Sequence, residues 1–378
     1  MTEPGSAPSD APVLALLLRV ARPTAPSRGP EDGAAVGRGR LEELLPAPTA
    51  SWDDVLDIFA YHRLTPLLFR RVADAGLRGH IPPAALGRLT DEASAVAARS
   101  LAHARALVEL VRKLTESGIR SLAFKGPVLA QELDGDLGLR FFRDIDVLVA
   151  EEDFPRAQAV VDELGYALHP AAARAGPSPV PHHHVAYTRG QVILELHRTL
   201  LSPYRGLEGR LDALWERRRS RTLAGTDLPT LGAEDEILHL SVHGSGHAWF
   251  RLRWLADLPA WLNAHPDVDW EGLLAAARAH RFERAFLLGW RLAREHLGVE
   301  LPGALSVAER RCGALDALAR RCATAWVPPV HPMGDEGRFA GYQLRLLEGW
   351  SNRAWFVRAQ GLRIAGPALV RALASGRM

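Results

Sequence analysis

The stretch Arg143-Asp144-Ile145-Asp146-Val147-Leu148-Val149 decides the fold expected for this chain. Its apolar residues predict a short strand, and the side chains of a strand alternate between its two faces. Asp144 and Asp146 therefore share one face, and the branched aliphatic residues share the other. Two adjacent carboxylates repel each other unless a cation neutralises them, and such a pair commonly holds a Mg²⁺ ion that also binds substrate phosphates. The stretch predicts phosphoryl or nucleotidyl transfer, unless one Asp caps a turn and the other faces solvent.

The composition fits a soluble globular protein. The 378 residues, 47% hydrophobic and 24% charged, suffice for two or three domains. A formal net charge of +2 argues against strong sequence-independent binding to nucleic acid. The two cysteines, Cys312 and Cys322, lack ligand-like neighbours, so we expect buried thiols and a cytoplasmic protein. No apolar run is long enough to span a membrane, and the N-terminal residues lack the order of a secretory signal.

The pattern along the chain predicts an α+β protein. Ser51 is a plausible N-cap, a long amphipathic helix pattern runs from about 83 to 117, and short strands alternate with helices from about 120 to 197. Arg189-Gly190 joins two strand-like runs as a hairpin would. The expected segments are a loosely structured arm at 1–50, a helical segment at 51–118, a small mixed α/β core at 119–205, a helical domain at 206–330 and a basic helical tail at 331–378.

A turn and two arginines are candidates for binding phosphate. In Lys125-Gly126-Pro127, glycine lets the backbone approach a ligand, and proline suits the first position of a helix whose N–H groups can face an anion. Arg140 and Arg143 lie before Asp144 and could pair with phosphate oxygens. Alternatively, the turn is a plain connection and the arginines are exposed cations that offset Asp134 and Asp136.

A third acid lies in the run from Val192 to His197, where alternation places Glu195 and His197 on one face. If this strand lies beside the strand of Asp144 and Asp146, Glu195 completes an acidic triad that can hold two divalent ions. Glu195 could also accept the proton of an attacking hydroxyl. The alternative is an ordinary edge strand whose Glu and His face water.

Taken together, these motifs resemble the uncharacterised nucleotidyltransferase family of the DNA polymerase β-like superfamily. The matching pieces are Phe124-Lys125-Gly126, Arg140 to Val149, Asp153 with a helix ending at Leu164-Gly165-Tyr166, Leu194-Glu195-Leu196-His197, and a later helical run from Leu238 to Leu258. The resemblance covers roughly residues 50 to 300. It implies a small mixed-sheet polymerase β-like core, flanked by N-terminal helices and a C-terminal helical domain.

The resemblance also implies an activity and its residues. It implies Mg²⁺ dependence with one or two ions, an NTP donor, and Asp144, Asp146 and Glu195 as the metal-binding, catalytic acids. Lys125, Gly126, Arg140, Arg143 and His197 are the residues expected to contact the nucleotide. Gly126-Pro127 replaces the Gly-Ser of the wider superfamily, so Lys125 is expected to supply charge to the phosphates. The acceptor is expected to be a peptide natural product or another small molecule.

Two further functions are compatible with the sequence. The chain could be a non-catalytic nucleotide-binding scaffold that binds a peptide or a partner enzyme through its helices and basic tail. It could also be a metal phosphohydrolase, because His239, His243 and His247 recur every four residues and would form one stripe on a helix. The run His182-His183-His184 is interpreted as the start of a strand rather than a ligand cluster.

Overall fold

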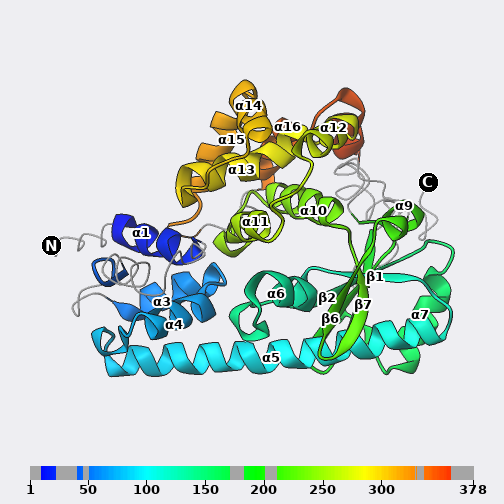
Figure 1. Ribbon diagram of the computed structural model, residues 1–378, viewed down its shortest axis with the longest axis horizontal. Coiled ribbons are helices and arrows are strands. Elements are labelled where there is room, and N and C mark those ends of the chain that lie inside the picture. Colours follow the sequence, from blue (N-terminus) through cyan, green and yellow to red (C-terminus); the bar gives the residue numbers. More distant parts are fainter. Residues whose placement is uncertain are drawn as a thin grey trace, which may run out of the picture.

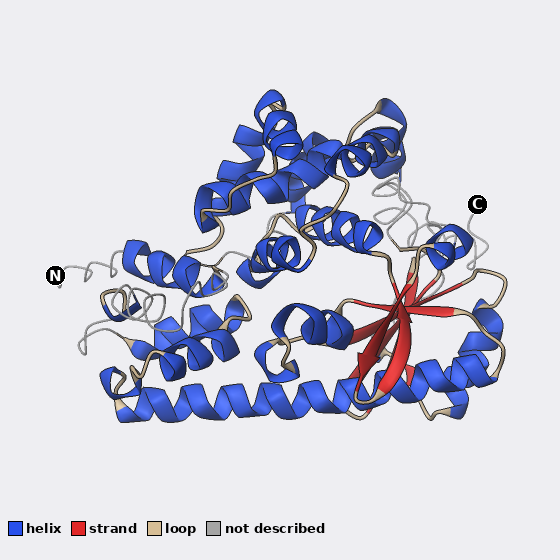
Figure 2. Cartoon of the chain, in the orientation of Figure 1, coloured by secondary structure: helices blue, strands red, loops and turns tan. Residues whose placement is uncertain are grey.

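A seven-stranded mixed sheet, ordered β3-β4-β5-β2-β1-β7-β6, is the centre of the fold. The computed structural model describes residues 10–22, 41–45, 51–170, 183–200, 211–327, 329 and 336–358. The strands are β1 (Ser121–Phe124), β2 (Asp144–Val149), β3 (Ala167–Leu168), β4 (His184–Arg189), β5 (Val192–His197), β6 (Arg219–Leu223) and β7 (Thr226–Thr230). The pairs β2–β5 and β1–β7 are parallel, and the other neighbours are antiparallel. Figure 2 shows this sheet at one side of a largely helical molecule, which confirms the α+β class.

Helices precede the sheet, cover it and follow it (Figure 1). Those before and around the sheet are α1 (Asp10–Ala21), α3 (Trp52–Tyr61), α4 (Thr65–Asp74), α5 (Pro83–Glu116), α6 (Gly126–Asp134), α7 (Phe154–Glu163) and α9 (Leu211–Glu216), with 3₁₀ turns η1 (Arg78–His80) and η2 (Leu137–Leu139). Those that follow are α10 (Ala233–Gly246), α11 (Leu252–Ala264), α12 (Trp270–Ala279), α13 (Glu283–Leu297), α14 (Gly303–Arg311), α15 (Leu315–Ala323) and α16 (Glu336–Leu346).

Helix α5 joins the N-terminal helices to the sheet. It has 34 residues, which at the rise of an α-helix makes it about 51 Å long. It runs along the base of the molecule beneath both α4 and the sheet (Figure 1). Leu89 belongs to the core shared by the N-terminal and C-terminal helices, whereas Leu107 and Leu110 pack in the core beneath the sheet. One continuous helix therefore supports both parts.

The two faces of β2 have different environments, as the alternation of its sequence predicts. Ile145, Val147 and Val149 are buried in the core that includes residues of α5 and α7. Leu148, on the opposite face, packs in a smaller core that includes Leu211 of α9. Asp144 and Asp146 share that second face, because side chains of a strand alternate. The carboxylates are thus turned away from α5.

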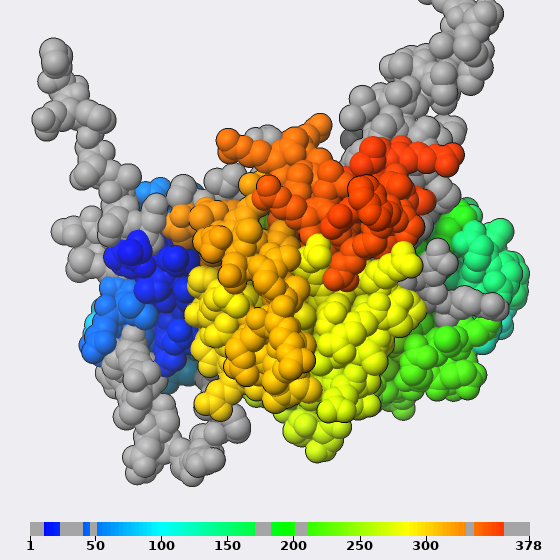
Figure 3. Space-filling model, turned by 90° about the horizontal axis from the view of Figure 1, so that it is seen from above, coloured from blue at the N-terminus to red at the C-terminus, as the bar shows by residue number. Residues whose placement is uncertain are grey.

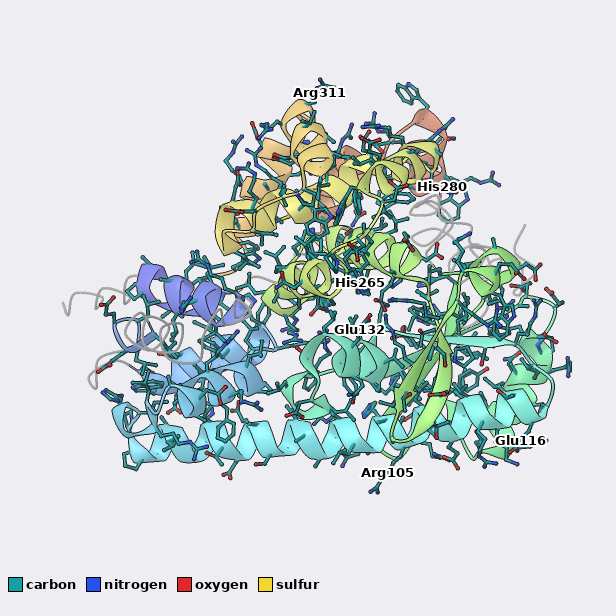
Figure 4. All side chains as sticks on the ribbon, viewed as in Figure 1. Arg105, Glu116, Glu132, His265, His280 and Arg311 are labelled. Atoms are coloured by element: carbon teal, nitrogen blue, oxygen red, sulfur yellow. The ribbon has the colours of Figure 1, made fainter. Side chains whose placement is uncertain are left out.

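Charged side chains join helix α6 to the edge strand β6 and to the C-terminal helices. Glu132 of α6 and His265, just after α11, face each other (Figure 4), with Glu132 Oε1 2.9 Å from His265 Nε2. Arg221 of β6 pairs with Glu132 and also with Glu236 of α10, whose Oε2 lies 3.2 Å from Arg221 Nη2. The sheet, α6 and α10 are held together by charges that neutralise one another.

The expectation of a loosely structured arm at 1–50 is corrected over the part that the structure describes, residues 10–22 and 41–45. Residues 10–21 form helix α1, and Leu16 and Leu17 are fully buried in the core shared with the C-terminal helices. Figure 3 shows α1, in blue, directly beside the yellow and orange helices. The apolar piece is short and has Pro/Gly-rich flanks, so its sequence alone did not reveal the surface that it covers.

The expected boundary between a core ending at 205 and a helical domain starting at 206 is also corrected. Strands β6 and β7 lie at 219–230 and extend the sheet, with β7 parallel to β1. Their side chains are largely polar because β6 is an edge strand whose arginines form ion pairs, so the apolar alternation expected of a strand is weak. Of the expected tail at 331–378, only 336–358 lies within the described residues. Across the described parts of the chain, every helix is too short or too polar to cross a bilayer.

Candidate active site

The parallel pairing of β2 and β5 brings three predicted acids to one face of the sheet. Asp146 is the register partner of Glu195, and Asp144 lies two residues earlier on the same strand. The prediction that the two strands are neighbours is confirmed. Strand β5 lies between β4 and β2, so it is an interior strand and the edge-strand alternative is wrong.

Asp146 is the most buried of the three acids, with a side chain only 3% exposed. Its Oδ1 lies 3.0 Å from His197 Nε2 and 3.5 Å from Lys125 Nζ. His197 Nε2 also lies 3.5 Å from Glu195 Oε2. These contacts tie the ends of β1, β2 and β5 together, and they exclude the alternative in which Asp146 faces solvent.

Asp144 lies at the more open side of this group. Its side chain is 24% exposed, and its Oδ2 lies 3.6 Å from Nη2 of the exposed Arg143. Burial, together with the negative charges of Asp146 and Glu195, raises the pKa of Asp144 to about 6. A carboxyl group whose ionised form is disfavoured by like charges is stabilised when a cation binds beside it.

The other titratable groups of the site respond to the same charges. Although burial alone would raise the pKa of Glu195, the hydrogen bond from His197 and the nearby imidazole of His184 hold it below its usual range. Burial would lower the pKa of His197, but its hydrogen bonds to Asp146 and Glu195 raise it overall. Three carboxylates contact two permanent cations, Lys125 and Arg143, and two imidazoles, so oxygen ligands are present and the negative charges outnumber the permanent positive charges. This donor set fits a hard divalent cation such as Mg²⁺.

The turn before α6 is held against β2. Lys125 has φ 54° and ψ −150°, and Gly126 has φ 40°, so both residues adopt backbone conformations that disfavour L side chains. A Cβ at position 126 would lie 3.3 Å from the backbone oxygen of Asp144. Glycine therefore lets the turn approach the first residue of β2, and Lys125 extends from this turn toward Asp146.

Arg140, expected to contact the nucleotide, has a different position and role. Its Nη1 and Nη2 lie 2.8 and 2.7 Å from the two carboxylate oxygens of Asp257 in α11, and its Nε lies 2.9 Å from Asp134 Oδ2. The side chain is 5% exposed. Its donors are committed to two buried carboxylates, so Arg140 joins α6 to α11 and is not available to a phosphate. The alternative interpretation, an exposed Arg140 that offsets Asp134, is right about the partner but wrong about the exposure, because the Arg140 side chain is buried.

Helix α5 fixes the backbone that leads into the site. The Ser100 hydroxyl donates to the backbone oxygen of Arg140 at 3.1 Å, and His103 Nε2 lies 3.0 Å from the backbone oxygen of Arg143. These two contacts position the segment that carries Arg143 and Asp144. Arg143 itself, 62% exposed, remains a candidate for contacting an anion.

Two residues that were not predicted as ligands extend the group. His184 starts β4, as expected, but the register also makes it the partner of His197. Its Nε2 lies 3.6 Å from Glu195 Oε1, and its Nδ1 lies 3.0 Å from His183 Nε2. Burial lowers the pKa of His183 to about 2 and that of His184 to about 4. His182 lies outside the described residues.

The sequence contained a signal for this arrangement. In a hairpin, the residue numbers of partners on the two strands have a constant sum, and Arg189 pairs with Val192. The predicted turn at Arg189-Gly190 would have placed residue 182 opposite His197, and the observed turn, one residue later at Gly190-Gln191, places His184 there. The register of the hairpin, rather than the histidine run itself, identifies the cluster.

The stripe of His239, His243 and His247 has a different environment. Neighbouring rings in the stripe are 5.8 and 4.7 Å apart between centroids, and the His239 ring lies 5.2 Å from that of Phe124. Among the residues that the structure describes, the groups with metal-ligand geometry do not include this stripe. The geometry gives no support to a phosphohydrolase centred on it.

Comparisons with known proteins give a family and one distant structural likeness. The family model described as "Uncharacterised nucleotidyltransferase" matches residues 48–298. The solved structure titled "Solution Structure of Antibiotic-Resistance Factor ANT(2'')-Ia Reveals Substrate-Regulated Conformation Dynamics" is similar, with a TM-score of 0.36 and 14% sequence identity. That similarity covers 48% of this chain and 93% of the other. No curated protein matches the chain.

Proposed function

The chain belongs to the uncharacterised nucleotidyltransferase family, and from this premise we propose that it transfers an NMP group from an NTP to an acceptor, releasing pyrophosphate. The proposed acids are Asp144, Asp146 and Glu195. The reaction is attack of an acceptor hydroxyl on the α-phosphorus, in which the bond from the α-phosphorus to the bridging oxygen breaks. Positioning and charge neutralisation account for most of the rate in reactions of this type.

The proposal rests on one observation, which is that Asp146 pairs in register with Glu195 and that Asp144 lies on the same face of the sheet. Three carboxylates on one face of two adjacent strands would repel one another without a counter-charge. Lys125 supplies one positive charge at 3.5 Å from Asp146. When bound, divalent ions would balance the remaining charge and bring the NTP phosphates to the carboxylates.

The protein's own residues would divide the remaining work. His197 holds Asp146 in place through a hydrogen bond, and Lys125 and the exposed Arg143 are positioned to neutralise phosphate charge. The lowered pKa of Glu195 favours a role as metal ligand over the role of proton acceptor. The raised pKa of Asp144 belongs to the metal-free site and falls when a cation neutralises the neighbouring carboxylates, so Asp144 is proposed as a metal ligand, and the proton of the attacking hydroxyl is released to water.

The acceptor that we propose is a peptide natural product or another small molecule. The near-neutral net charge of +2 supports this class over a nucleic acid, which would call for a broad basic surface. The alternative is a non-catalytic nucleotide-binding scaffold, which would bind an NTP without turnover and bind a peptide or a partner enzyme through its helices and basic tail.

Labelled NTPs test the proposed reaction. The full chain is incubated with Mg²⁺, an acceptor pool of small molecules and peptides, and an NTP labelled either on the α- or on the γ-phosphate. We expect α-label in a new product together with pyrophosphate release, and a loss of at least about 10²-fold in Asp146→Asn. Glu152→Gln, which removes an exposed acid near β2, is the matched control and should be unaffected. Transfer of the γ-label would contradict the proposal, and NTP binding without turnover would favour the scaffold.

A further inference from the structure

Three histidines gather beside the acidic site at the ends of β4 and β5. The imidazoles of His183, His184 and His197 each offer a nitrogen, and these three nitrogens lie within 4.8 Å of one another. Their ring centroids are separated by 4.3 Å for His183–His184, 5.0 Å for His184–His197 and 5.6 Å for His183–His197. The cluster contains only nitrogen donors, in contrast to the oxygen donors of the neighbouring acids.

The hydrogen bonds of His197 fix which of its nitrogens could bind a ligand. Nε2 lies 3.0 Å from Asp146 Oδ1, and an ionised carboxylate only accepts, so Nε2 carries the proton. In the neutral imidazole Nδ1 then has a lone pair, and a metal ion that binds there displaces the proton that the imidazolium form carries on this atom. This atom is buried and has no hydrogen-bond partner within the described part of the chain. A buried acceptor without a partner carries a cost in free energy that a bound cation would remove.

His184 also lies between a carboxylate and a second imidazole, with a longer carboxylate contact. Its Nε2 faces Glu195 Oε1 at 3.6 Å, and its Nδ1 lies 3.0 Å from His183 Nε2. Histidines that bind metals usually present the second ring nitrogen to a carboxylate, which fixes the tautomer and increases the basicity of the ligating nitrogen. His197 has such a carboxylate at hydrogen-bond distance and His184 has one nearby, and a metal ion would replace the hydrogen bond between His184 Nδ1 and His183 Nε2.

We propose that His183, His184 and His197 together bind one transition-metal ion of the zinc class, such as Zn²⁺ or Co²⁺. Zn–N bonds of about 2.0–2.1 Å place tetrahedral ligand nitrogens about 3.3 Å apart, close to the spacing of His183 and His184. Mg²⁺ prefers oxygen ligands, whereas imidazoles suit Zn²⁺ and its neighbours. This site is separate from the proposed Mg²⁺ site and does not depend on nucleotidyl transfer. The two adjoin through Asp146 and Glu195, which orient the histidines.

The test uses Co²⁺ as a spectroscopic probe. The untagged full chain is titrated with CoCl₂ in the absence of nucleotide, and the visible d–d absorption is followed. We expect one tightly bound equivalent with the intense bands of tetrahedral nitrogen ligation. His183→Ala and His184→Ala should each weaken Co²⁺ binding by at least about 10- to 100-fold. His80→Ala, which removes a surface histidine paired with Glu42, is the matched control and should bind as the unmodified chain does.

Two further measurements separate this site from the acidic one. Asp144 is not a member of the histidine group, so Asp144→Asn should bind Co²⁺ normally even where Mg²⁺-dependent NTP binding is lost. Circular dichroism identifies any variant that does not fold, and His183→Gln and His184→Gln then replace the alanine variants. The proposal is overturned if the chain binds no Co²⁺, or if the His183 and His184 variants bind it as tightly as His80→Ala. In that case, the contact between His183 and His184 is an ordinary hydrogen bond between imidazoles.

Discussion

Replacing Arg140 by alanine should destabilise the protein far more than any other change near the site. Arg140 and Arg253 neutralise Asp134 and Asp257, and all four side chains are 9% exposed or less. The group contains two positive and two negative charges. Arg140→Ala leaves two buried carboxylates with a single guanidinium and removes three hydrogen bonds of 2.7 to 2.9 Å.

The expected loss follows from the cost of a buried, unpaired charge. Removing one partner of a buried ion pair typically costs about 3–5 kcal/mol. Arg253 remains 3.4 Å from Asp257 Oδ1 and 2.6 Å from Asp134 Oδ1, so it can compensate in part. We therefore expect a decrease of about 3–4 kcal/mol in the free energy of unfolding. Arg143→Ala removes an exposed cation three residues away and should change stability by less than about 0.5 kcal/mol.

Urea denaturation at pH 7 measures both variants, and NTP binding to the folded protein is measured alongside. The account expects Arg140→Ala to lose stability and to retain the NTP affinity of its folded fraction. If Arg140→Ala is as stable as Arg143→Ala, the buried ion pairs assigned to Arg140 are contradicted. If Arg140→Ala loses NTP affinity without losing stability, the phosphate-binding role first expected for Arg140 is supported instead.

Three further predictions concern glycines and pH. Gly126 has φ 40°, and a Cβ there would lie 3.3 Å from a backbone oxygen, so Gly126→Ala should lower the free energy of unfolding by about 1–2 kcal/mol and weaken Mg²⁺-dependent NTP binding. Its control is Gly87→Ala, in open space on α5, which should raise the free energy of unfolding by about 0.5–1 kcal/mol. Equal effects of the two variants in denaturation curves would contradict the tight turn. Gly289→Ala would place a Cβ 2.4 Å from Trp249 and should cost about 1–3 kcal/mol, which a thermal melt without any shift would disprove. Because Asp144 keeps its proton to about pH 6 when folded and releases it near pH 4 when unfolded, metal-free stability falls across that window. In EDTA, Asp144→Asn should therefore gain up to about 3 kcal/mol at pH 8 and little at pH 4; a gain that does not depend on pH would show that like-charge repulsion is not the cause.

Local patterns in the sequence predicted the part of the site that lies on single strands. The alternation of Asp144, Ile145 and Asp146 is set by the geometry of one strand, and the structure has the two acids on the face opposite the aliphatic residues. The alternation from Val192 to His197 likewise predicted a strand with Glu195 and His197 on one face, and of the two positions left open for it, the structure has the one beside β2. Such features depend on neighbours two residues away.

Features that depend on distant partners were not predicted. Arg140 pairs with Asp257, which is 117 residues away, and nothing near Arg140 distinguishes a buried partner from an exposed one. Helix α1 is stabilised by its contact with the C-terminal helices, and β6 and β7 by pairing at the edge of the sheet. The histidine cluster is an intermediate case, because the hairpin was predicted, but its turn lies one residue later than expected, and this shift decides which histidine faces His197.

The central claim is that Asp144, Asp146 and Glu195 jointly bind divalent ions that hold an NTP. Calorimetric titration of the full chain with a non-hydrolysable NTP analogue, with and without Mg²⁺, tests it without knowledge of the acceptor. The account predicts tight binding only with Mg²⁺, a loss of at least about 10-fold in Asp146→Asn and in Glu195→Gln, and no change in Glu152→Gln. Binding that is independent of Mg²⁺, or equally strong in all of these variants, would contradict it.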